Sequence, residues 1–328
     1  MRKGFRALAV LGPLSVATTL GAGLLSRAAA PAPGSSGYHV VKTVSIPGDE
    51  GWDYLTVDAA ARRVYISHGS HVAVMNADTY TVEGDIPDTQ GVHGIALAPD
   101  LGRGFVSAGR ANTAVIFDIK SLKTLGTVKT DANPDAIVYD SVTKRVFTLN
   151  GRGQNTTAIN GADGKGSIFV NIEDKNELVQ FDAQKITETH RWPLAPCKSP
   201  SGLAMDLKNR RLFAVCDEKV MAVVNADTGA VVATPTICDG PDAAGFDPAT
   251  GYVFASCGDG NLTVIHEDSP NKYSVVENVP TKRSARTMGL DLETHNIFLP
   301  SAEFDAPAAG ERRGKMKPGS FGIVVVSK

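Results

Sequence analysis

The chain has 328 residues, of which 42% are hydrophobic and 21% are charged. These fractions are ordinary for a folded globular protein, so they exclude a disordered chain and a membrane protein with many spans. The 33 basic residues stand against 35 acidic residues, which gives a net charge of −2. Because there is no basic excess, nonspecific binding to nucleic acid is not expected.

The start of the chain has the pattern of a secretory signal peptide. A positive start with Arg2, Lys3 and Arg6 precedes a mostly apolar run at 7–25, and three alanines at 28–30 fit a cleavage site. The alternative is an uncleaved membrane anchor, because 19 residues nearly reach across a bilayer. Glycines and a proline within the run weaken that alternative, so we predict cleavage.

Cleavage of the predicted signal peptide at 1–30 leaves a linker at 31–37 and then the folded protein. The removed segment holds four basic and no acidic residues, so 29 basic and 35 acidic residues remain, with a net charge of −6. We therefore expect a periplasmic or secreted protein with no stable membrane span. Export also permits disulfide bonds.

One pattern of short strands recurs along the rest of the chain. A short apolar strand ends at an Asp or Pro turn, a second strand carries an aromatic residue, and a third and fourth strand follow. The aromatic residue serves as a ruler, recurring at intervals of 40, 42, 66, 41 and 44 residues: Tyr65, Phe105, Phe147, Phe213, Phe254 and Phe298. Four short strands repeated about every 40 residues predict an all-β protein, the β-propeller.

The interval of 66 residues between Phe147 and Phe213 does not fit one unit. Phe169 lies in a further pair of strands and divides this interval into 22 and 44 residues. About 20 residues are therefore missing, enough for the outer strand of one blade and the innermost strand of the next. We predict seven four-stranded blades with a shortened junction between the third and the fourth. The alternative is a six-bladed ring in which these two blades are fused.

The two ends of the chain complete each other. Residues 322–326 form a third strand with no fourth strand after it, and residues 39–46 form a fourth strand with no first three before it. Pairing of the two would remove an exposed sheet edge. We therefore predict a single β-propeller domain at 38–328, in which the N-terminal strand closes the last blade.

At this level of detail the repeat resembles the bacterial YncE-like, YVTN-type β-propeller family across nearly all of residues 38–328. The resembling stretches are GWDYLTVD at 51–58, GVHG at 91–94, NPDAI at 133–137, VNIEDK at 170–175 and HEDSP at 266–270. The resemblance implies an exported seven-bladed propeller, in a family whose function is usually unassigned. The shortened junction departs from the family pattern.

Polar residues recur at the predicted start of each innermost strand, twelve residues before the aromatic ruler. Innermost strands line the central channel, so these residues are expected at one mouth of it: Asp53, His93, Asp135, Ser201, Asp242 and Arg286. We predict that they form a ligand-binding site. Four of them could coordinate a cation through oxygen or nitrogen, although we expect no bound metal. The alternative is that the channel mouth is polar only because it is exposed to solvent.

The four cysteines follow the same register. Cys197 and Cys238 lie 16 residues before a ruler aromatic, and Cys216 and Cys257 lie three residues after it. In this topology the loop before the first strand meets the end of the second strand. We therefore predict the disulfides Cys197–Cys216 and Cys238–Cys257, out of three possible pairings. A four-Cys zinc site is the alternative, but no C-x₂-C spacing supports it.

No catalytic motif is assembled anywhere in the sequence. C-x-x-C-H for haem and G-x-G-x-x-G for a dinucleotide are both missing, so no cofactor is expected. We predict a monomeric, non-enzymatic scaffold whose partner is a small molecule or a protein rather than a nucleic acid. The alternative is a propeller enzyme, such as a calcium-dependent lactonase or lyase or a quinone-dependent dehydrogenase, which would use the Asp and His residues of the channel mouth.

Overall fold

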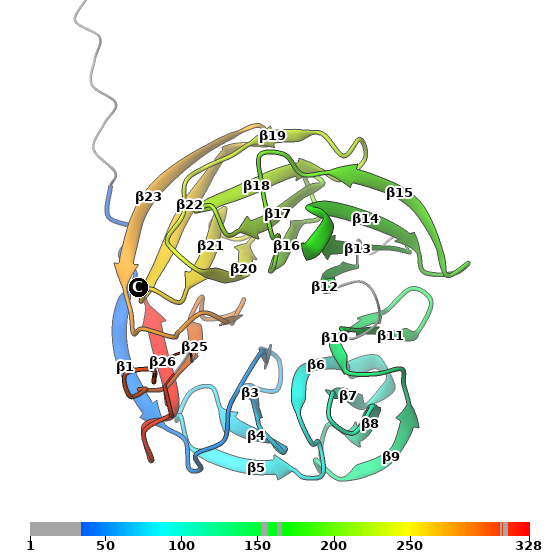
Figure 1. The fold of residues 1–328 in the computed structure, drawn as a ribbon, viewed down its shortest axis with the longest axis vertical. Helices are drawn as coiled ribbons and strands as arrows, with labels where there is room; N and C mark the ends of the chain where they lie inside the picture. Colours follow the sequence, from blue (N-terminus) through cyan, green and yellow to red (C-terminus); the bar gives the residue numbers. More distant parts are fainter. Residues whose placement is uncertain (1–33, 152–156, 163–165, 309, 311–313) are drawn as a thin grey trace, which may run out of the picture. The chain divides into compact units, whose positions relative to one another are not determined.

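The computed structural model describes residues 34–151, 157–162, 166–308, 310 and 314–328. Residues 33–328 form one compact unit, in which antiparallel sheets stand around a central axis as in a β-propeller (Figure 1). The predicted signal peptide at 1–30 lies outside the described residues. Part of the predicted linker is described, and Ser36 is buried there with its backbone N–H donating to Glu277 Oε1 at 2.7 Å.

The first half of the ring contains two complete blades, a hairpin and a third complete blade. The strands of the two complete blades are β2 (Leu55–Asp58), β3 (Arg63–His68), β4 (His71–Asn76) and β5 (Val82–Ile86), then β6 (Val92–Ala98), β7 (Arg103–Ala108), β8 (Thr113–Asp118) and β9 (Thr124–Lys129). The hairpin is β10 (Pro134–Asp140) with β11 (Arg145–Asn150). The next blade holds β12 (Thr157–Ala162), β13 (Ser167–Ile172), β14 (Glu177–Asp182) and β15 (Thr187–Pro193).

The second half of the ring contains three complete blades. They are formed by β16 (Leu203–Asp206), β17 (Arg211–Cys216), β18 (Val220–Asn225) and β19 (Val231–Ala233); by β20 (Pro241–Asp247), β21 (Tyr252–Cys257), β22 (Asn261–Ser269) and β23 (Lys272–Pro280); and by β24 (Gly289–Leu290), β25 (Ile297–Ser301), β26 (Gly322–Ser327) and β1 (His39–Ser45). Two short 3₁₀ helices, η1 (Pro99–Leu101) and η2 (Glu173–Lys175), connect strands.

The prediction of a β-propeller is confirmed, but the predicted count of seven blades is wrong. The described residues form six four-stranded blades, and the β10–β11 hairpin stands between two of them as a separate two-stranded sheet. The innermost strand expected to be missing is present, because β12 pairs with β13. What the described residues lack is instead a third and a fourth strand beside β11. Strand β12 is not predicted because its sequence, TAINGA, lacks the apolar alternation of the other innermost strands.

The ring closes as predicted at the two ends of the chain. Strand β1 pairs antiparallel with β26 and is the outermost strand of the last blade. The two ends therefore hold each other in one sheet, and β1 covers the edge of β26 that would otherwise be exposed.

The aromatic ruler marks residues that pack between blades. Tyr65, Phe213, Phe254 and Phe298 have no exposed surface, and Phe169 is buried in the same way. Each belongs to an apolar cluster shared by adjacent blades; Phe254, for example, packs with Leu299 of the next blade. Because each blade is packed between two neighbours that cover its two faces, such residues make up the core.

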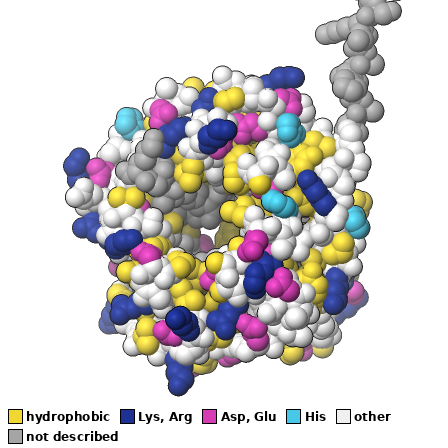
Figure 2. Space-filling model, turned by 180° about the vertical axis from the view of Figure 1, so that it is seen from behind, with side chains coloured by type: hydrophobic (Ala, Val, Ile, Leu, Met, Phe, Trp, Pro, Cys, Tyr) yellow, Lys and Arg dark blue, Asp and Glu magenta, His cyan; other side chains and the backbone are white. Residues whose placement is uncertain are grey.

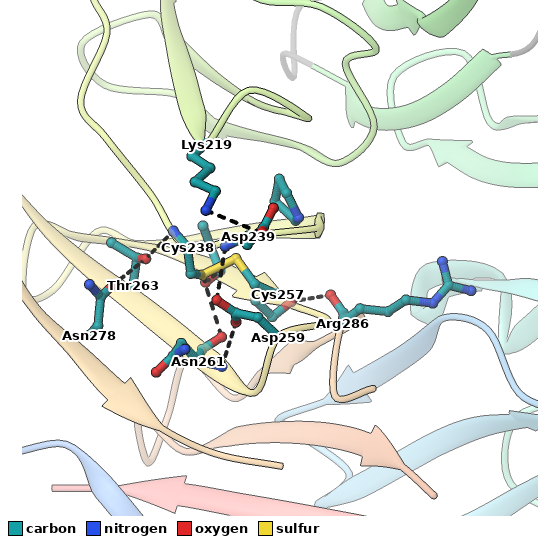
Figure 3. Close-up of a disulfide and its surroundings, with 12 residues drawn as sticks. Lys219, Cys238, Asp239, Cys257, Asp259, Asn261, Thr263, Asn278 and Arg286 are labelled. Carbon is teal, nitrogen blue, oxygen red and sulfur yellow. Dashed lines mark hydrogen bonds and ion pairs between the residues drawn. A yellow bond between two sulfur atoms is a disulfide. The ribbon is translucent and has the colours of Figure 1, made fainter. Parts of the chain in front are cut away.

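Both predicted disulfides are present. The Cα atoms are 5.5 Å apart in Cys197–Cys216 and 5.8 Å apart in Cys238–Cys257. Figure 3 shows that the Cys238–Cys257 bridge lies at the end of β21, while the Arg286 side chain extends away from it. The two disulfides are compatible with an oxidising, exported compartment. Within the described residues, no helix is long and apolar enough to cross a membrane.

Candidate functional site

The structure brings all six predicted mouth residues together. Asp53, Asp135, Ser201, Asp242 and Arg286 line one cavity of about 350 Å³. His93 lies beside it, in contact with two of these carboxylates. Figure 2 shows the ring from behind, hollowed at its centre. The cavity is of the size that accepts a small molecule.

Strand register explains why residues so distant in sequence meet here. Each innermost strand begins at the same end of the channel, and His93, Asp135 and Asp242 are the second residues of β6, β10 and β20. Asp53 and Ser201 precede β2 and β16 by two residues. One repeated backbone position therefore supplies one side chain from each of several sheets.

His93 lies between two carboxylates. Its Nδ1 is 2.7 Å from Asp53 Oδ2 and 3.6 Å from Asp135 Oδ1. An ionised carboxylate only accepts hydrogen bonds, so Nδ1 carries the proton. The hydrogen bond with Asp53 raises the pKa of His93, burial opposes this, and the charge of Asp135 adds to the rise. The imidazole is therefore favoured in its cationic form.

Arg286 is paired on the other side of the cavity. Its guanidinium contacts the Asp242 carboxylate, and its Nη2 lies 4.0 Å from Asp53 Oδ1. Burial raises the pKa of Asp242 to about 6, while the positive charge of Arg286 acts against that rise. The Tyr54 hydroxyl lies 3.5 Å from Asp242 Oδ1 and closes this side of the cavity.

Two acidic groups of the site have no full cationic partner. Asp135 meets only His93, at 3.6 Å, and the Glu173 carboxylate makes no hydrogen bond or ion pair among the described residues. Burial raises the pKa of both Asp135 and Glu173. Together with Asp53 and Asp242, they make four carboxylates against Arg286 and His93, so acidic groups outnumber basic groups among the described residues of the cavity.

Glu173 is not among the site residues predicted from the sequence; it lies in η2 directly after β13. The register contains a signal for it, since the position four residues after the aromatic is glycine in four units. Those glycines leave room for the mouth residues: a Cβ at Gly109 would lie 2.7 Å from His93 Nε2, and one at Gly151 would lie 3.3 Å from Asp135 Oδ2. Glu173 places a carboxylate at this position, where four other units have a glycine, and this departure is the signal in the sequence.

Buried hydroxyl and amide groups hold the mouth residues by their backbone, and these were also missed. Ser107 Oγ donates to Asp135 O at 2.5 Å, Asn171 Nδ2 donates to Ser201 O at 3.0 Å, and Ser256 Oγ donates to Arg286 O at 2.5 Å. All three lie two residues after the aromatic of the preceding sheet. They tie neighbouring sheets together at the mouth and so fix the geometry of the site.

Asp53, His93 and Asp135 could hold a divalent cation, because their ligand atoms lie within 4.8 Å of one another. Coordination by His93 Nδ1 would require loss of its proton and of the bond to Asp53. In the structure His93 Nδ1 and Asp53 Oδ2 are already engaged with each other at 2.7 Å. The cluster of Asp53, His93 and Asp135 is therefore poorly suited to a divalent metal ion. The carboxylates of Asp135 and Glu173 are better suited to an organic cation.

The titration of His93 tests this electrostatic arrangement. We expect an NMR titration of the His93 ring to show a midpoint above the ordinary value of 6.5. The Asp53→Asn variant should lower this midpoint, because the hydrogen bond to Asp53 is the main cause of the raised pKa. Asp85→Asn, which removes a carboxylate near His71, should leave it unchanged. An Asp53→Asn titration identical to that of the unchanged protein would contradict the assigned pairing.

The same shift has a consequence for stability. Since the folded-state pKa of His93 is raised, folding binds a proton, and the stabilisation is complete below pH ~6.5. It is lost as the pH rises through the folded-state pKa. Urea unfolding should therefore show that the unchanged protein is more stable than a His93→Gln variant by a difference in unfolding free energy that decreases as the pH rises.

No family model matches the chain, and no curated protein matches it. Among solved structures, the chain is similar to U3-55K, with a TM-score of 0.71, 8% identity, and coverage of 90% of this chain and 100% of that one. It is also similar to the WD40 repeats of RRP9, with a TM-score of 0.70, 10% identity, and coverage of 90% and 99%. A chain of the mitotic checkpoint complex gives a TM-score of 0.70 at 14% identity, with coverage of 100% and 99%. These likenesses show the fold alone: the protein is a β-propeller.

Proposed function

We propose that this protein is an exported, non-enzymatic binding propeller whose channel mouth takes a small, positively charged organic molecule. The observation that carries the proposal is the cavity of about 350 Å³ in which Asp135 and Glu173 have no full cationic partner among the described residues. A bound organic cation would supply the missing charge, and one that carries N–H groups would also donate hydrogen bonds to the two carboxylates. The resemblance to YncE-like propellers agrees with an exported protein that lacks assembled catalytic groups.

The cost of burying these carboxylates supports a cationic ligand. Burial raises the pKa of both groups because an ionised carboxylate loses water; at Asp135 the charges of His93 and Arg286 offset only part of this loss, and at Glu173 no positive charge offsets it among the described residues. A cationic ligand recovers that lost solvation, whereas an anionic ligand would add to the repulsion. On the opposite wall Arg286 is already engaged by Asp242, so it offers little attraction to an anion.

A metal-dependent enzyme is the second candidate, and the cluster of Asp53, His93 and Asp135 favours it. A divalent cation there would act as a Lewis acid on a bound lactone or related substrate. The two candidates differ in the residues that they need. The organic cation depends on Glu173, whereas the metal depends on His93.

Binding to the unchanged protein, residues 31–328, tests both candidates. We expect at least one of spermidine, agmatine and choline to raise the melting temperature, since a ligand at 100 times its dissociation constant stabilises by about 2.7 kcal/mol. Isothermal titration should show the affinity lost in the double variant Asp135→Asn, Glu173→Gln. Glu188→Gln, on the outermost strand β15, is the matched control and should bind normally.

The outcomes separate the candidates. Binding of CaCl₂ that is lost in His93→Gln but kept in Glu173→Gln would favour the metal site and overturn the organic cation. Failure of all three amines to bind, or equal binding by the double variant, would also overturn the proposal.

A further inference from the structure

Strand β11 has a free edge in the part of the chain that the structure describes. In each of the six complete blades the second strand is paired on both sides, whereas β11 pairs only with β10 among the described residues. A strand edge presents unpaired backbone N–H and C=O groups, which are ready to pair with another strand. The β10–β11 hairpin is therefore unlike every other sheet of the ring.

The side chains of β11 are less covered than those of the equivalent strands. In β3, β13, β17, β21 and β25 nearly every residue is buried, whereas Val146, Phe147 and Leu149 of β11 all remain partly exposed. Phe147 occupies the ruler position at which Phe105 on β7 is also partly exposed, whereas the five other aromatics are buried. Residues that form the core elsewhere are thus open to solvent here.

Apolar side chains of the two neighbouring blades face the free edge of β11. On β8, Val115 and Phe117 pack toward the preceding blade, so alternation turns Ile116 toward the hairpin. Val128 of β9 pairs with Ala114 on that same face and is 53% exposed. From the other side, Phe181 of β14 joins the apolar cluster that contains Phe147 and is only partly buried. Apolar surface therefore flanks the free edge on both sides.

Nothing in β11 protects its edge. Native edge strands are commonly guarded by Lys, Glu or Pro, or by a bulge. The sequence RVFTLN contains none of these residues, and its one charge, on Arg145, is engaged with the carbonyl oxygens of Ala183 and Gln184 at 2.9 and 2.7 Å. The edge is thus open to a further strand.

We propose that β11 is a docking site for an extended segment of a partner protein, which adds to the hairpin as an antiparallel strand. The other blades show what covers this position: third strands such as HVAVMN in β4 and VMAVVN in β18, with alternating Val, Ala and Met. The occupant is expected to have the same pattern. Main-chain pairing supplies affinity, and the apolar side chains supply specificity.

A second copy of this chain fits the edge poorly. In the complete blades two further strands lie outside the second strand, so β11 is set back from the rim by about 10 Å, two strand spacings. Two such edges, each set back between its own flanking blades, would not reach each other. A slender peptide segment can enter where a whole propeller cannot.

Binding of a synthetic hairpin tests the proposal. The probe is a labelled peptide that copies residues 111–130, the β8–β9 pair, and its binding is followed by fluorescence anisotropy. We expect saturable binding, weakened at least about tenfold by Thr148→Lys, which places an unpaired charge on the edge. Thr127→Lys, on the exposed outer strand β9, is the matched control and should bind like the unchanged protein. The same peptide carrying proline at positions 115 and 127 should not bind.

Hydrogen exchange keeps the proposal testable should the variant fail to fold. In the unchanged protein alone, alternate amides of β11 should exchange much faster than those of β3 and β21, and the peptide should slow them. Protection of β11 equal to that of β3 without peptide would overturn the proposal. So would equal peptide binding by Thr148→Lys, or a dimer in sedimentation that this variant abolishes, since the occupant would then be a second copy.

Discussion

A variant in which Cys197 and Cys216 are both replaced by Ala is expected to unfold with about 3 kcal/mol less free energy than the unchanged protein. The disulfide closes a loop with a sequence separation of 19 residues, and it restricts the unfolded chain far more than the folded one. Both cysteines are buried, so the native sheet must also lose packing. Urea unfolding monitored by circular dichroism measures the difference.

The second disulfide provides the matched comparison. Cys238–Cys257 has the same separation of 19 residues, so its removal should cost a similar free energy. Reduction of the unchanged protein should then lower stability by more than either double variant does alone. A Cys197→Ala, Cys216→Ala variant as stable as the unchanged protein would contradict the role assigned to the loop.

The repeat made much of the fold predictable from sequence. Because every unit places its aromatic in the same strand, one register predicted most of the strands and both disulfides, and the two unpaired end strands predicted the closure of the ring by β1. The same register predicted which residues meet at the channel mouth, although it says nothing of their partners. A repeated backbone geometry converts equal spacing in sequence into proximity in space.

The remainder depended on interactions that sequence spacing does not encode. Strand β12 was missed because backbone pairing with β13, rather than an apolar pattern, makes it a strand. Glu173 was missed because it belongs to a turn, and only the ring places it beside Asp135. The pairing of His93 with Asp53, and of Arg286 with Asp242, likewise depends on side-chain directions across sheets.

Two substitutions at the same ruler position are expected to differ widely in cost. Phe254→Ala removes a fully buried ring that packs edge-on against Tyr38, with the ring centres 5.2 Å apart, so it should cost about 3–5 kcal/mol. Phe147→Ala removes a ring that is partly exposed on β11, so it should cost on the order of 1 kcal/mol. Urea unfolding of both variants under the same conditions measures the contrast.

This contrast arises from the two strands that the hairpin lacks. In the complete blade of Phe254, β22 and β23 cover the second strand, and β11 has no such cover among the described residues. A Phe147→Ala variant as unstable as Phe254→Ala would mean that β11 is covered in the free protein, and the docking edge would then be closed. A small cost that grows when the hairpin peptide is present would instead show Phe147 becoming part of the core on binding, because the added strand supplies the contacts that a third strand makes elsewhere in the ring.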